Sequence, residues 1–348
     1  MTGIAARPSF GVELHEYLDP ASILDEVHLA EELGYDAVWL GDSQLIWREM
    51  YVLLGAAAAT TQRVALGSGV TNPFTRHMAV TASALVTLQE LSGGRVLAGV
   101  GLGDSALAVL GQRPVSMAAL EAFVAGVRGL AEGEAVRASE VDLQLVFGGP
   151  AKCPPIVVAA SGPKMLGLAG RIGDGVIVTR QARAGATLSA MLGCVREGRE
   201  ASVRRERPFR TCLSASVAVH PDRTPALQAV RPHVASTLRA RLHWELSPAA
   251  ALARERIVAA YDMYEHMNPA AAHAGLVPDD VIPEFAIAGT ADECIEQALG
   301  LFQAGVDEIT IRPYGVDGAP RSATMVEFAH QVMAPVLDRA RRQRSTAG

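Results

Sequence analysis

One stretch in the first third of the chain, residues 64–104, restricts the fold most strongly. It contains two short apolar runs, Val64–Val70 and Val96–Val100, separated by one amphipathic helical segment, Thr75–Leu91. A strand, a helix and a second strand in this order predict a right-handed parallel crossover. Ligands of parallel α/β folds bind at the carboxyl ends of the strands. We therefore expect a binding site in the small-residue loops that follow these two strands.

The same alternation of apolar runs and helical segments continues along the chain, and it predicts a single-domain (β/α)8 TIM barrel over residues 1–348. The expected strands are Ser9–Leu14, Ala37–Leu40, Val64–Val70, Val96–Val100, Ile156–Ala160, Gly175–Val178, Thr211–Val219 and Glu308–Arg312. The expected helices are Pro20–Leu33, Arg48–Thr60, Thr75–Leu91, Ser116–Ala131, Pro163–Arg171, Ala184–Glu200, Ala291–Gln303 and Ser322–Arg341. A hairpin is expected within residues 133–153.

Residues 221–286 break this rhythm. They are too long for one loop and are mostly helical in pattern. We expect a helical insertion here, before the helix Ala291–Gln303, placed over the mouth of the barrel and acting as a lid.

Charge and cysteine usage narrow the class of protein. The 348-residue chain has a formal net charge of −6, which argues against nucleic-acid partners and against binding to anionic membrane surfaces. Its four cysteines are widely spaced and form no Cys-x-x-Cys pair, so we expect free thiols in a reducing compartment. There is no His-Glu-x-x-His metal motif and no uninterrupted apolar run of about 18 residues. We expect a soluble cytoplasmic protein without a metal site.

Three loops of small residues follow expected strands and are candidate ligand contacts: Gly67–Pro73, Gly99–Asp104 and Ala159–Pro163. Glycines permit strained backbone and the close approach of a flat ligand, and the N–H groups at a helix start suit a phosphate. Gly99–Asp104 lacks the spacing of the dinucleotide fingerprint, whose third glycine follows the second by three residues. Each loop is also compatible with an ordinary turn, and Ser161 with a plain helix N-cap.

Acidic and imidazole side chains at strand ends are the candidates for proton chemistry. Glu13 and His15 lie two residues apart at the end of the first expected strand, so in an extended chain they share a face. Asp42 follows the second strand and Asp104 the fourth, and Asp42 is equally suited to cap the next helix. We expect Glu13, together with Asp42 or His15, to handle protons.

Eight segments spread over nearly the whole chain carry a family resemblance. They are Gly34–Asp42, Gly69–His77, Thr81–Ser83, Glu90–Arg95, Gly99–Asp104, Ala160–Pro163, Asp174–Gly175 and Ala288–Thr290. Together they closely resemble the luciferase-like superfamily of flavin-dependent oxidoreductases, and within it the branch that contains methylenetetrahydromethanopterin reductase.

This resemblance implies a barrel that holds FMN or the deazaflavin F420 at the carboxyl ends of its strands. It implies that Asp42 contacts the ring region of the cofactor, that Gly69–Val70 is a non-prolyl cis peptide supporting one ring face, and that Glu13 is an acid near the ring. The residues implied to line the ring and the ribityl chain are Thr71, Asn72, Gly101, Leu102, Gly103 and Asp104. Those implied to bind the cofactor phosphate are Ala160, Ser161 and Gly162.

The chain departs from the family pattern at one place. F420-dependent members often have Thr-Asp-His or Ser-Asp-His at the end of the second strand, where this chain has Gly41, Asp42 and Ser43. The histidine of the family's proton-handling scheme is therefore absent from that position, and the choice of F420 over FMN is weakened.

Three functions follow as hypotheses. The first, which we favour, is F420-dependent hydride transfer to or from a small organic substrate. The second is an FMNH2-dependent monooxygenase that works with a partner flavin reductase. The third is a flavin-binding relative without turnover, since fold does not imply function. The resemblance also implies a homodimer. We expect a small-molecule substrate, and neither nucleic acid nor membrane as a partner.

Overall fold

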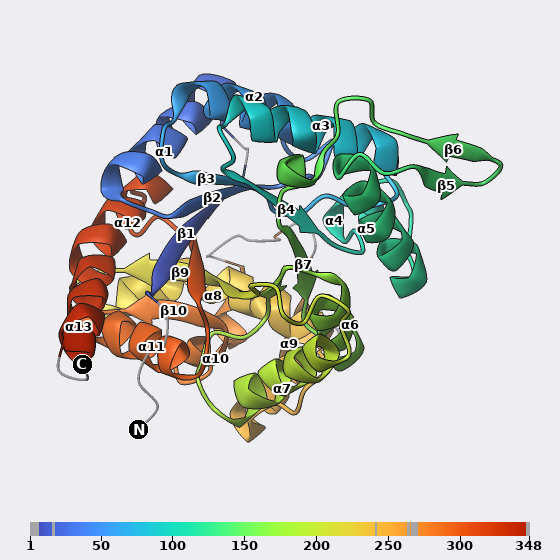
Figure 1. The fold of residues 1–348 in the computed structure, drawn as a ribbon. Helices are drawn as coiled ribbons and strands as arrows, with labels where there is room; N and C mark the ends of the chain where they lie inside the picture. The colour runs from blue at the N-terminus through green and yellow to red at the C-terminus, as the bar shows by residue number, and fades with distance from the viewer. Residues whose placement is uncertain (1–6, 16–17, 241, 263–264, 266–270, 346–348) are drawn as a thin grey trace.

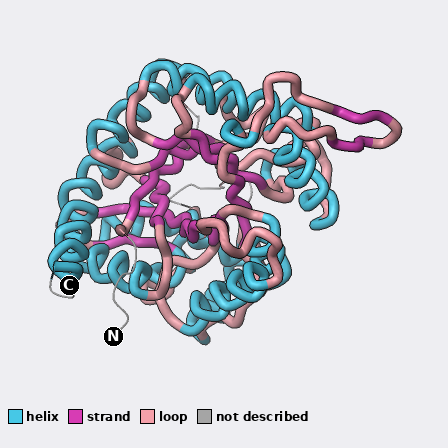
Figure 2. The backbone as a smooth tube through the Cα atoms, viewed as in Figure 1, coloured by secondary structure: helices cyan, strands magenta, loops and turns pink. Residues whose placement is uncertain are grey.

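The computed structural model describes residues 7–15, 18–240, 242–262, 265 and 271–345. Eight parallel strands close into a ring with the helices outside it, so the expected (β/α)8 barrel is confirmed (Figure 2). The ring closes because β8 pairs with β9. Its strands, in spatial order, are β1 (Ser9–Leu14), β2 (Ala37–Leu40), β3 (Ala65–Ser68), β4 (Val96–Val100), β7 (Ile156–Ala160), β8 (Gly175–Val178), β9 (Arg210–Val219) and β11 (Glu308–Pro313).

The outer helices carry recognisable start and stop signals. In α1, Asp19 caps the first turn through the N–H groups of Ala21 and Ser22, and Gly34 ends the helix at φ 84°. Thr290 and Glu293 form a capping box at the start of α11. The helices are α1 (Pro20–Leu33), α2 (Met50–Thr60), α3 (Met78–Leu91), α5 (Met117–Ala131), α6 (Pro163–Ile172), α7 (Ala186–Glu200), α11 (Ala291–Gln303), α12 (Arg321–Phe328) and α13 (Ala334–Ser345).

Two boundaries differ from the sequence expectation for a local reason. The third strand ends at Ser68, and α3 begins at Met78 rather than at residue 75. Asn72 Oδ1 accepts hydrogen bonds from the N–H groups of Phe74 and Thr75, which holds this segment in a turn. His77 then caps α3 through the N–H of Ala79. A polar side chain therefore competes with the helix for these backbone groups.

The last expected helix, Ser322–Arg341, is uninterrupted, but one segment of it is π-helical rather than α-helical. Between α12 and α13 lies one π-helical segment, Ala329–Met333. The expected hairpin is present as β5 (Val136–Ala138) and β6 (Val141–Leu143), which project away from the barrel (Figure 1). Two short helical turns, α4 (Ser105–Ala108) and η1 (Pro150–Lys152), were not expected from the sequence.

The predicted helical insertion contains α8 (Arg223–Arg239), α9 (Pro248–Ala260), η2 (Ala274–Leu276) and α10 (Ile282–Phe285). It is followed by a strand that was not expected from the sequence, β10 (Ala286–Gly289). This strand pairs with the last four residues of β9, Ser216–Val219. This four-residue segment, Ala-Ile-Ala-Gly, has neither the length nor the β-branched content that indicates a strand. The buried faces of α8 and α9 share a second apolar cluster with β10.

The interior of the barrel is filled by a cluster of side chains, of which the indole of Trp39 is the largest. Trp39, on β2, is 2% exposed, and a Cβ atom added at Gly67 on β3 would lie 2.2 Å from its ring. Its Nε1 donates to Glu308 Oε1 at 3.1 Å. Glu308 is fully buried and pairs with Arg210 at the amino end of the barrel. The interior is a packed plug, so a ligand must bind at one of the barrel's ends.

No helix within the described ranges is long and apolar enough to cross a membrane. The four cysteines carry free thiols in the structure.

Candidate active site

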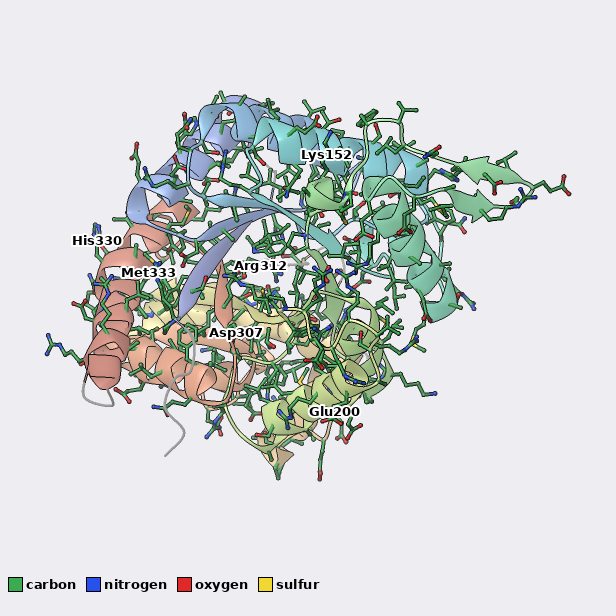
Figure 3. All side chains as sticks on the ribbon, viewed as in Figure 1. Lys152, Glu200, Asp307, Arg312, His330 and Met333 are labelled. Carbon is green, nitrogen blue, oxygen red and sulfur yellow. The ribbon has the colours of Figure 1, made fainter. Side chains whose placement is uncertain are left out.

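A cavity of about 670 Å³ opens at the carboxyl ends of the strands. It is the size of a small-molecule or cofactor site. Arg312, at the end of β11, lies near the centre of the ring of strands (Figure 3). The cavity is lined by the loops after β1, β2, β3, β4, β7 and β8, by Arg312 of β11, and by one short stretch of the insertion. Most predicted site residues line it: Glu13, His15, Asp42, Gly69, Val70, Asn72, Gly101, Leu102, Gly103, Asp104, Ala160 and Ser161.

Glu13, at the end of β1, is held by three side chains. Arg312 Nη2 donates to Oε1 at 2.7 Å and to Oε2 at 2.8 Å. Ser214 Oγ, on β9, donates to Oε2 at 2.7 Å, and His15 Nε2 lies 3.0 Å from Oε1. Because β1 and β11 are neighbouring parallel strands, their ends bring these groups together. The arrangement fixes the carboxylate in one orientation at the floor of the cavity.

The charges in this cluster determine which group can exchange a proton. Burial alone would raise the pKa of Glu13, but Arg312 and the hydrogen bonds from His15 and Ser214 lower that pKa far below its usual range. Glu13 is therefore a permanent carboxylate. Burial, assisted by Arg312, lowers the pKa of His15, although the hydrogen bond with Glu13 opposes this change. His15 is thus neutral near pH 7, with an anion placed to stabilise its protonated form.

His15 is also held by an aromatic partner. Its ring stacks on Trp47, with centroids 4.5 Å apart and an interplanar angle of 14°. Trp47 follows β2 in a loop that is tied to α4, because Ser43 Oγ lies 2.5 Å from Ser105 Oγ and Gln44 Nε2 donates to the Ala106 carbonyl. The stack and these two contacts place the imidazole at the rim of the cavity.

Asp42 is buried and oriented by two side chains from the next loop. Its Oδ2 accepts from Thr71 Oγ1 at 2.8 Å and lies 3.4 Å from Arg76 Nε. Arg76 also pairs with Glu49 and covers the ring of Tyr51. Asp42 does not cap α2, because Glu49 caps that helix through the N–H of Val52. The capping alternative for Asp42 is therefore wrong, and the carboxylate lines the cavity.

The segment after β3 forms a bulge. The Gly69–Val70 peptide is cis, as the family resemblance implies. Gly99 in β4 and Gly101 just after this strand permit its close approach. An added Cβ would lie 1.9 Å from the Ser68 carbonyl oxygen at Gly99, and 2.8 Å from Val70 Cγ2 at Gly101. The glycines thus accommodate the bulge itself, and both Val70 and Gly101 present their surfaces to the cavity.

Asn72 carries an unsatisfied buried donor in the cavity wall. Its side-chain oxygen is used in the turn before α3, and its Nδ2 has no hydrogen-bond partner among the described residues. Such a group indicates a ligand acceptor, because a buried donor without a partner is costly. Asp104 is different: its side chain is 87% exposed and lies 3.4 Å from Arg180 Nη2. It stands at the rim rather than in the depth of the site.

The loop after β7 meets the insertion. The Ser161 carbonyl accepts from Trp244 Nε1 at 2.6 Å, and a Cβ added at Gly162 would lie 2.7 Å from the ring of His243. Gly162 precedes α6 and has no side-chain cap, so the first N–H groups of α6 remain directed outward. Gly162 itself lies outside the cavity lining, as does Thr71, which is buried against Asp42.

Several lining residues were not identified from the sequence. Trp47, Arg180 and His243 line the cavity, and Ser214 lies directly behind it, hydrogen-bonded to Glu13. Ser214 has a signal that could be recognised, because it lies at an inward position of β9 opposite Thr310 of β11. His243 had none, because its position depends on the path of the insertion.

The chain matches the family model described as "Luciferase-like monooxygenase" over residues 1–308. A 5,10-methylenetetrahydromethanopterin reductase from Archaeoglobus fulgidus is 32% identical over 332 residues, covering 88% of this chain and 94% of that protein. An F420-dependent glucose-6-phosphate dehydrogenase from Nakamurella multipartita is 34% identical over 240 residues, covering 62% and 69%.

Among solved structures, the coenzyme F420 dependent tetrahydromethanopterin reductase from Methanopyrus kandleri has the same fold. It superimposes with a TM-score of 0.77 at 24% identity, covering 95% of this chain and all of that one. The family model, the identity to the Archaeoglobus relative and the shared barrel agree. The chain belongs to the luciferase-like monooxygenase family of enzymes.

Proposed function

We propose that this protein is an F420-dependent oxidoreductase that transfers a hydride to or from a small organic substrate at the mouth of the barrel. Two of the similar proteins, the dehydrogenase from Nakamurella and the reductase from Methanopyrus, are F420-dependent by name. The observation that carries the proposal is the cluster of His15, Glu13 and Arg312 in the wall of the same cavity as the Val70 bulge.

The cavity residues fit a tricyclic cofactor of this kind. The Val70 bulge offers an apolar surface for one ring face, and the orphaned Asn72 Nδ2 offers a donor to a ring or ribityl oxygen. The loop of Ala160, Ser161 and Gly162 with the start of α6 would hold the phosphate. When bound, F420 supplies the site for a hydride at its ring, and the protein supplies orientation, exclusion of water and proton transfer.

The proton has a defined route in this chain. If the substrate is an alcohol, its hydroxyl oxygen would have to lose a proton as the carbon is oxidised. His15 is neutral and can accept that proton, while Glu13 stabilises the resulting imidazolium. In the reverse direction the protonated His15 returns it. His15 thus takes the role for which family members use the histidine replaced here by Ser43.

Turnover tests this proposal. The purified protein is incubated with F420 under exclusion of oxygen, with panels of secondary alcohols and of compounds that carry C=N or C=C bonds, and the absorbance of the cofactor is followed. We expect at least one class to reduce F420 or to reoxidise F420H2. His15→Gln should slow that reaction about 100-fold, within the usual effect of losing an acid–base group. An unchanged rate in His15→Gln would remove the imidazole from the mechanism.

A second candidate is an FMNH2-dependent monooxygenase, favoured by the family to which the chain belongs. This activity needs reduced flavin from a partner reductase. Oxygen consumption with FMNH2 that is matched by an oxygenated product would support it over hydride transfer. Cofactor binding without consumption in both assays would leave only the third hypothesis, a binding protein without turnover.

We further propose that the chain forms a homodimer through α2 and α3. These adjacent helices expose apolar side chains, Val52 at 70% and Val80 at 56%, with Phe74 at 49% beside them. Exposed apolar side chains on two adjacent helices support a protein contact on this side of the barrel. Sedimentation of wild type and of Val52→Glu would then give a dimer and a monomer. The cytoplasmic location expected from the sequence stays a prediction.

A further inference from the structure

A second cavity, of about 550 Å³, lies at the opposite end of the barrel from the candidate active site. Its walls come from the residues just before β7, β8 and β9 and from the end of α5. Four arginines line it, Arg128, Arg204, Arg207 and Arg210, against two carboxylates, Asp174 and Glu132. Pro154 and Phe209 add apolar surface. The cavity therefore combines an excess of guanidinium groups with flat apolar walls.

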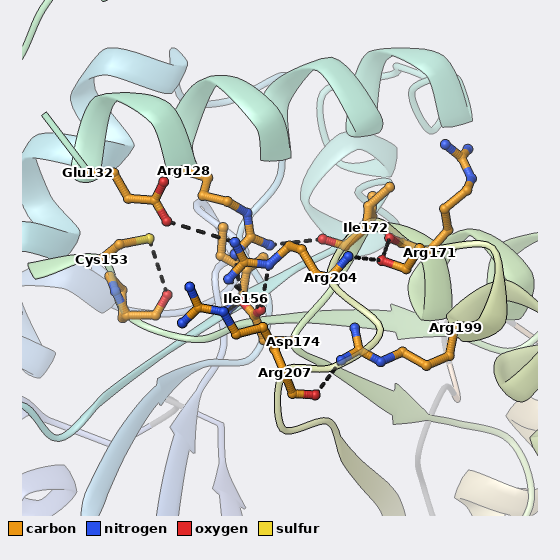
Figure 4. Close-up of polar contacts among 12 residues, drawn as sticks. Arg128, Glu132, Cys153, Ile156, Arg171, Ile172, Asp174, Arg199, Arg204 and Arg207 are labelled. Atoms are coloured by element: carbon orange, nitrogen blue, oxygen red, sulfur yellow. Dashed lines mark hydrogen bonds and ion pairs between the residues drawn. The ribbon is translucent and has the colours of Figure 1, made fainter. Parts of the chain in front are cut away.

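Asp174 is fully occupied within the protein. Its Oδ1 accepts from Arg204 Nε at 3.2 Å and Nη2 at 3.0 Å, and its Oδ2 accepts from Arg128 Nη1 at 2.7 Å and from the Ile156 N–H at 3.0 Å (Figure 4). Four donors use the lone pairs of a carboxylate completely. Asp174 has no remaining capacity to bind a cation, and it serves to hold the two arginines in place.

Donors remain on two arginines of the cavity. Arg204 Nη1 is 3.9 Å from Glu132 Oε1, too far for a hydrogen bond. The guanidinium of Arg207 makes no hydrogen bond or ion pair within the described part of the chain, and in Figure 4 its side chain extends toward Cys153. Burial raises the pKa of the Cys153 thiol to about 11, so this residue adds no negative charge. The unsatisfied groups facing the cavity are therefore mainly guanidinium donors.

We propose that this cavity binds a phosphate monoester, with the phosphate held between Arg204 and Arg207 and the organic part against Phe209 and Pro154. Guanidinium forks match the oxygens of a phosphate in geometry and charge. Because Arg210 is already paired with Glu308, Asp174 and Glu132 leave one net positive charge in the cavity, which a phosphate anion compensates. The site is separate from the phosphate loop proposed for the cofactor, because the plug of Trp39 and its neighbours lies between the two ends of the barrel.

Calorimetric titration with phenyl phosphate tests the site, with phenol as the uncharged control. The titration is done on the full chain, both alone and in the presence of saturating F420 or FMN, at constant ionic strength. We expect one saturable site for phenyl phosphate whose affinity does not depend on the cofactor, and no binding of phenol. Arg207→Gln should weaken it at least 10-fold and leave the melting temperature unchanged, because the side chain holds no other group.

The matched control is Arg205→Gln. Arg205 lies two residues before Arg207, and its exposed guanidinium pairs with Glu206. It should bind phenyl phosphate as wild type does. Three results would overturn the proposal: no saturable binding, equal weakening in both variants, or loss of binding when the cofactor is present. The last would place the phosphate at the mouth of the barrel. None of these results depends on whether the protein turns over F420.

Discussion

Arg312 donates from Nη2 to both oxygens of the Glu13 carboxylate, at 2.7 and 2.8 Å, and from Nε to Oε1 at 3.2 Å, across the neighbouring ends of β11 and β1. The two side chains are 20% and 11% exposed, so the pair lies largely out of water. In such surroundings the pair keeps Glu13 ionised and leaves His15 as the group that can exchange a proton.

Removal of Arg312 is expected to destabilise the protein and to raise the pKa of Glu13. A lowered folded-state pKa contributes stability above the ordinary value of about 4.3, and this contribution is lost as the pH falls through the folded value. Arg312→Gln should therefore lower the free energy of unfolding by about 3 kcal/mol at pH 7. The difference from wild type should shrink below about pH 4.

Denaturant unfolding at a series of pH values measures this effect. The control is Arg137→Gln, which removes an exposed pair with Asp142 on the hairpin and should change the stability by less than about 1 kcal/mol. Equal losses in the two variants at pH 7 would show that the Glu13 pair has no special energetic role.

A side chain at Gly101 should block the cofactor without unfolding the barrel. An added Cβ there lies 2.8 Å from Val70 Cγ2, and the larger Val side chain would extend into the cavity that Gly101 lines. Gly101→Val should abolish binding of F420 or FMN in a fluorescence titration, with an unchanged circular dichroism spectrum. Gly275→Ala, where no atom lies within 4 Å of the added Cβ, should bind normally. Full binding by Gly101→Val would exclude this loop from the site.

The packing inside the barrel predicts that substitutions at Gly67 and Trp39 have strongly coupled effects on stability. A methyl group at position 67 would meet the indole at 2.2 Å, so Gly67→Ala should cost about 1–3 kcal/mol of stability. In a Trp39→Phe background the smaller ring should reduce that cost, which a double-mutant cycle measures. Strictly additive changes would mean that the indole moves away at no cost. Gly55→Ala on α2, which has open space, should not be destabilising.

His233, on α8 of the insertion, should make the protein sensitive to mild acid. Burial and the charge of Arg312 lower its pKa to about 3, whereas in the unfolded chain it titrates near 6.5. The contribution of His233 to the free energy of unfolding is therefore fully present above about pH 6.5. It falls at lower pH because the unfolded state takes up the proton, and the loss reaches about 2 kcal/mol at pH 5. Chemical unfolding of His233→Gln should show a smaller loss over this range. His330→Gln, at an exposed position, should behave as wild type.

The barrel could be predicted from the sequence because the apolar runs are short and several helices carry their own end signals. Gly34 and the capping box of Thr290 and Glu293 are local signals of this kind. The start of α3 could not, because the side chain of Asn72 takes the backbone N–H groups that a helix would leave free. The strand β10 could not either, because its stability comes from pairing with β9 and not from its own residues.

For the candidate site, strand ends and small-residue loops indicated the region in which the cavity lies, and Glu13 and His15 meet as their spacing predicts. The partners that set their protonation come from far along the chain. Ser214 and Arg312 lie 201 and 299 residues from Glu13, and the barrel topology alone unites them. The roles of these residues stay predictions until they are tested.

Equilibrium titration of the purified protein with F420 and, separately, with FMN tests the central claim most directly. Cofactor fluorescence reports binding, and Asn72→Ala serves as the matched variant because it removes the orphaned Nδ2 donor from the cavity wall. We predict tight, saturable binding of F420, weaker binding of FMN, and a loss of about 10-fold in F420 affinity for Asn72→Ala, the equivalent of one hydrogen bond. Preference for FMN, or binding of neither cofactor by the folded protein, would contradict the proposed function.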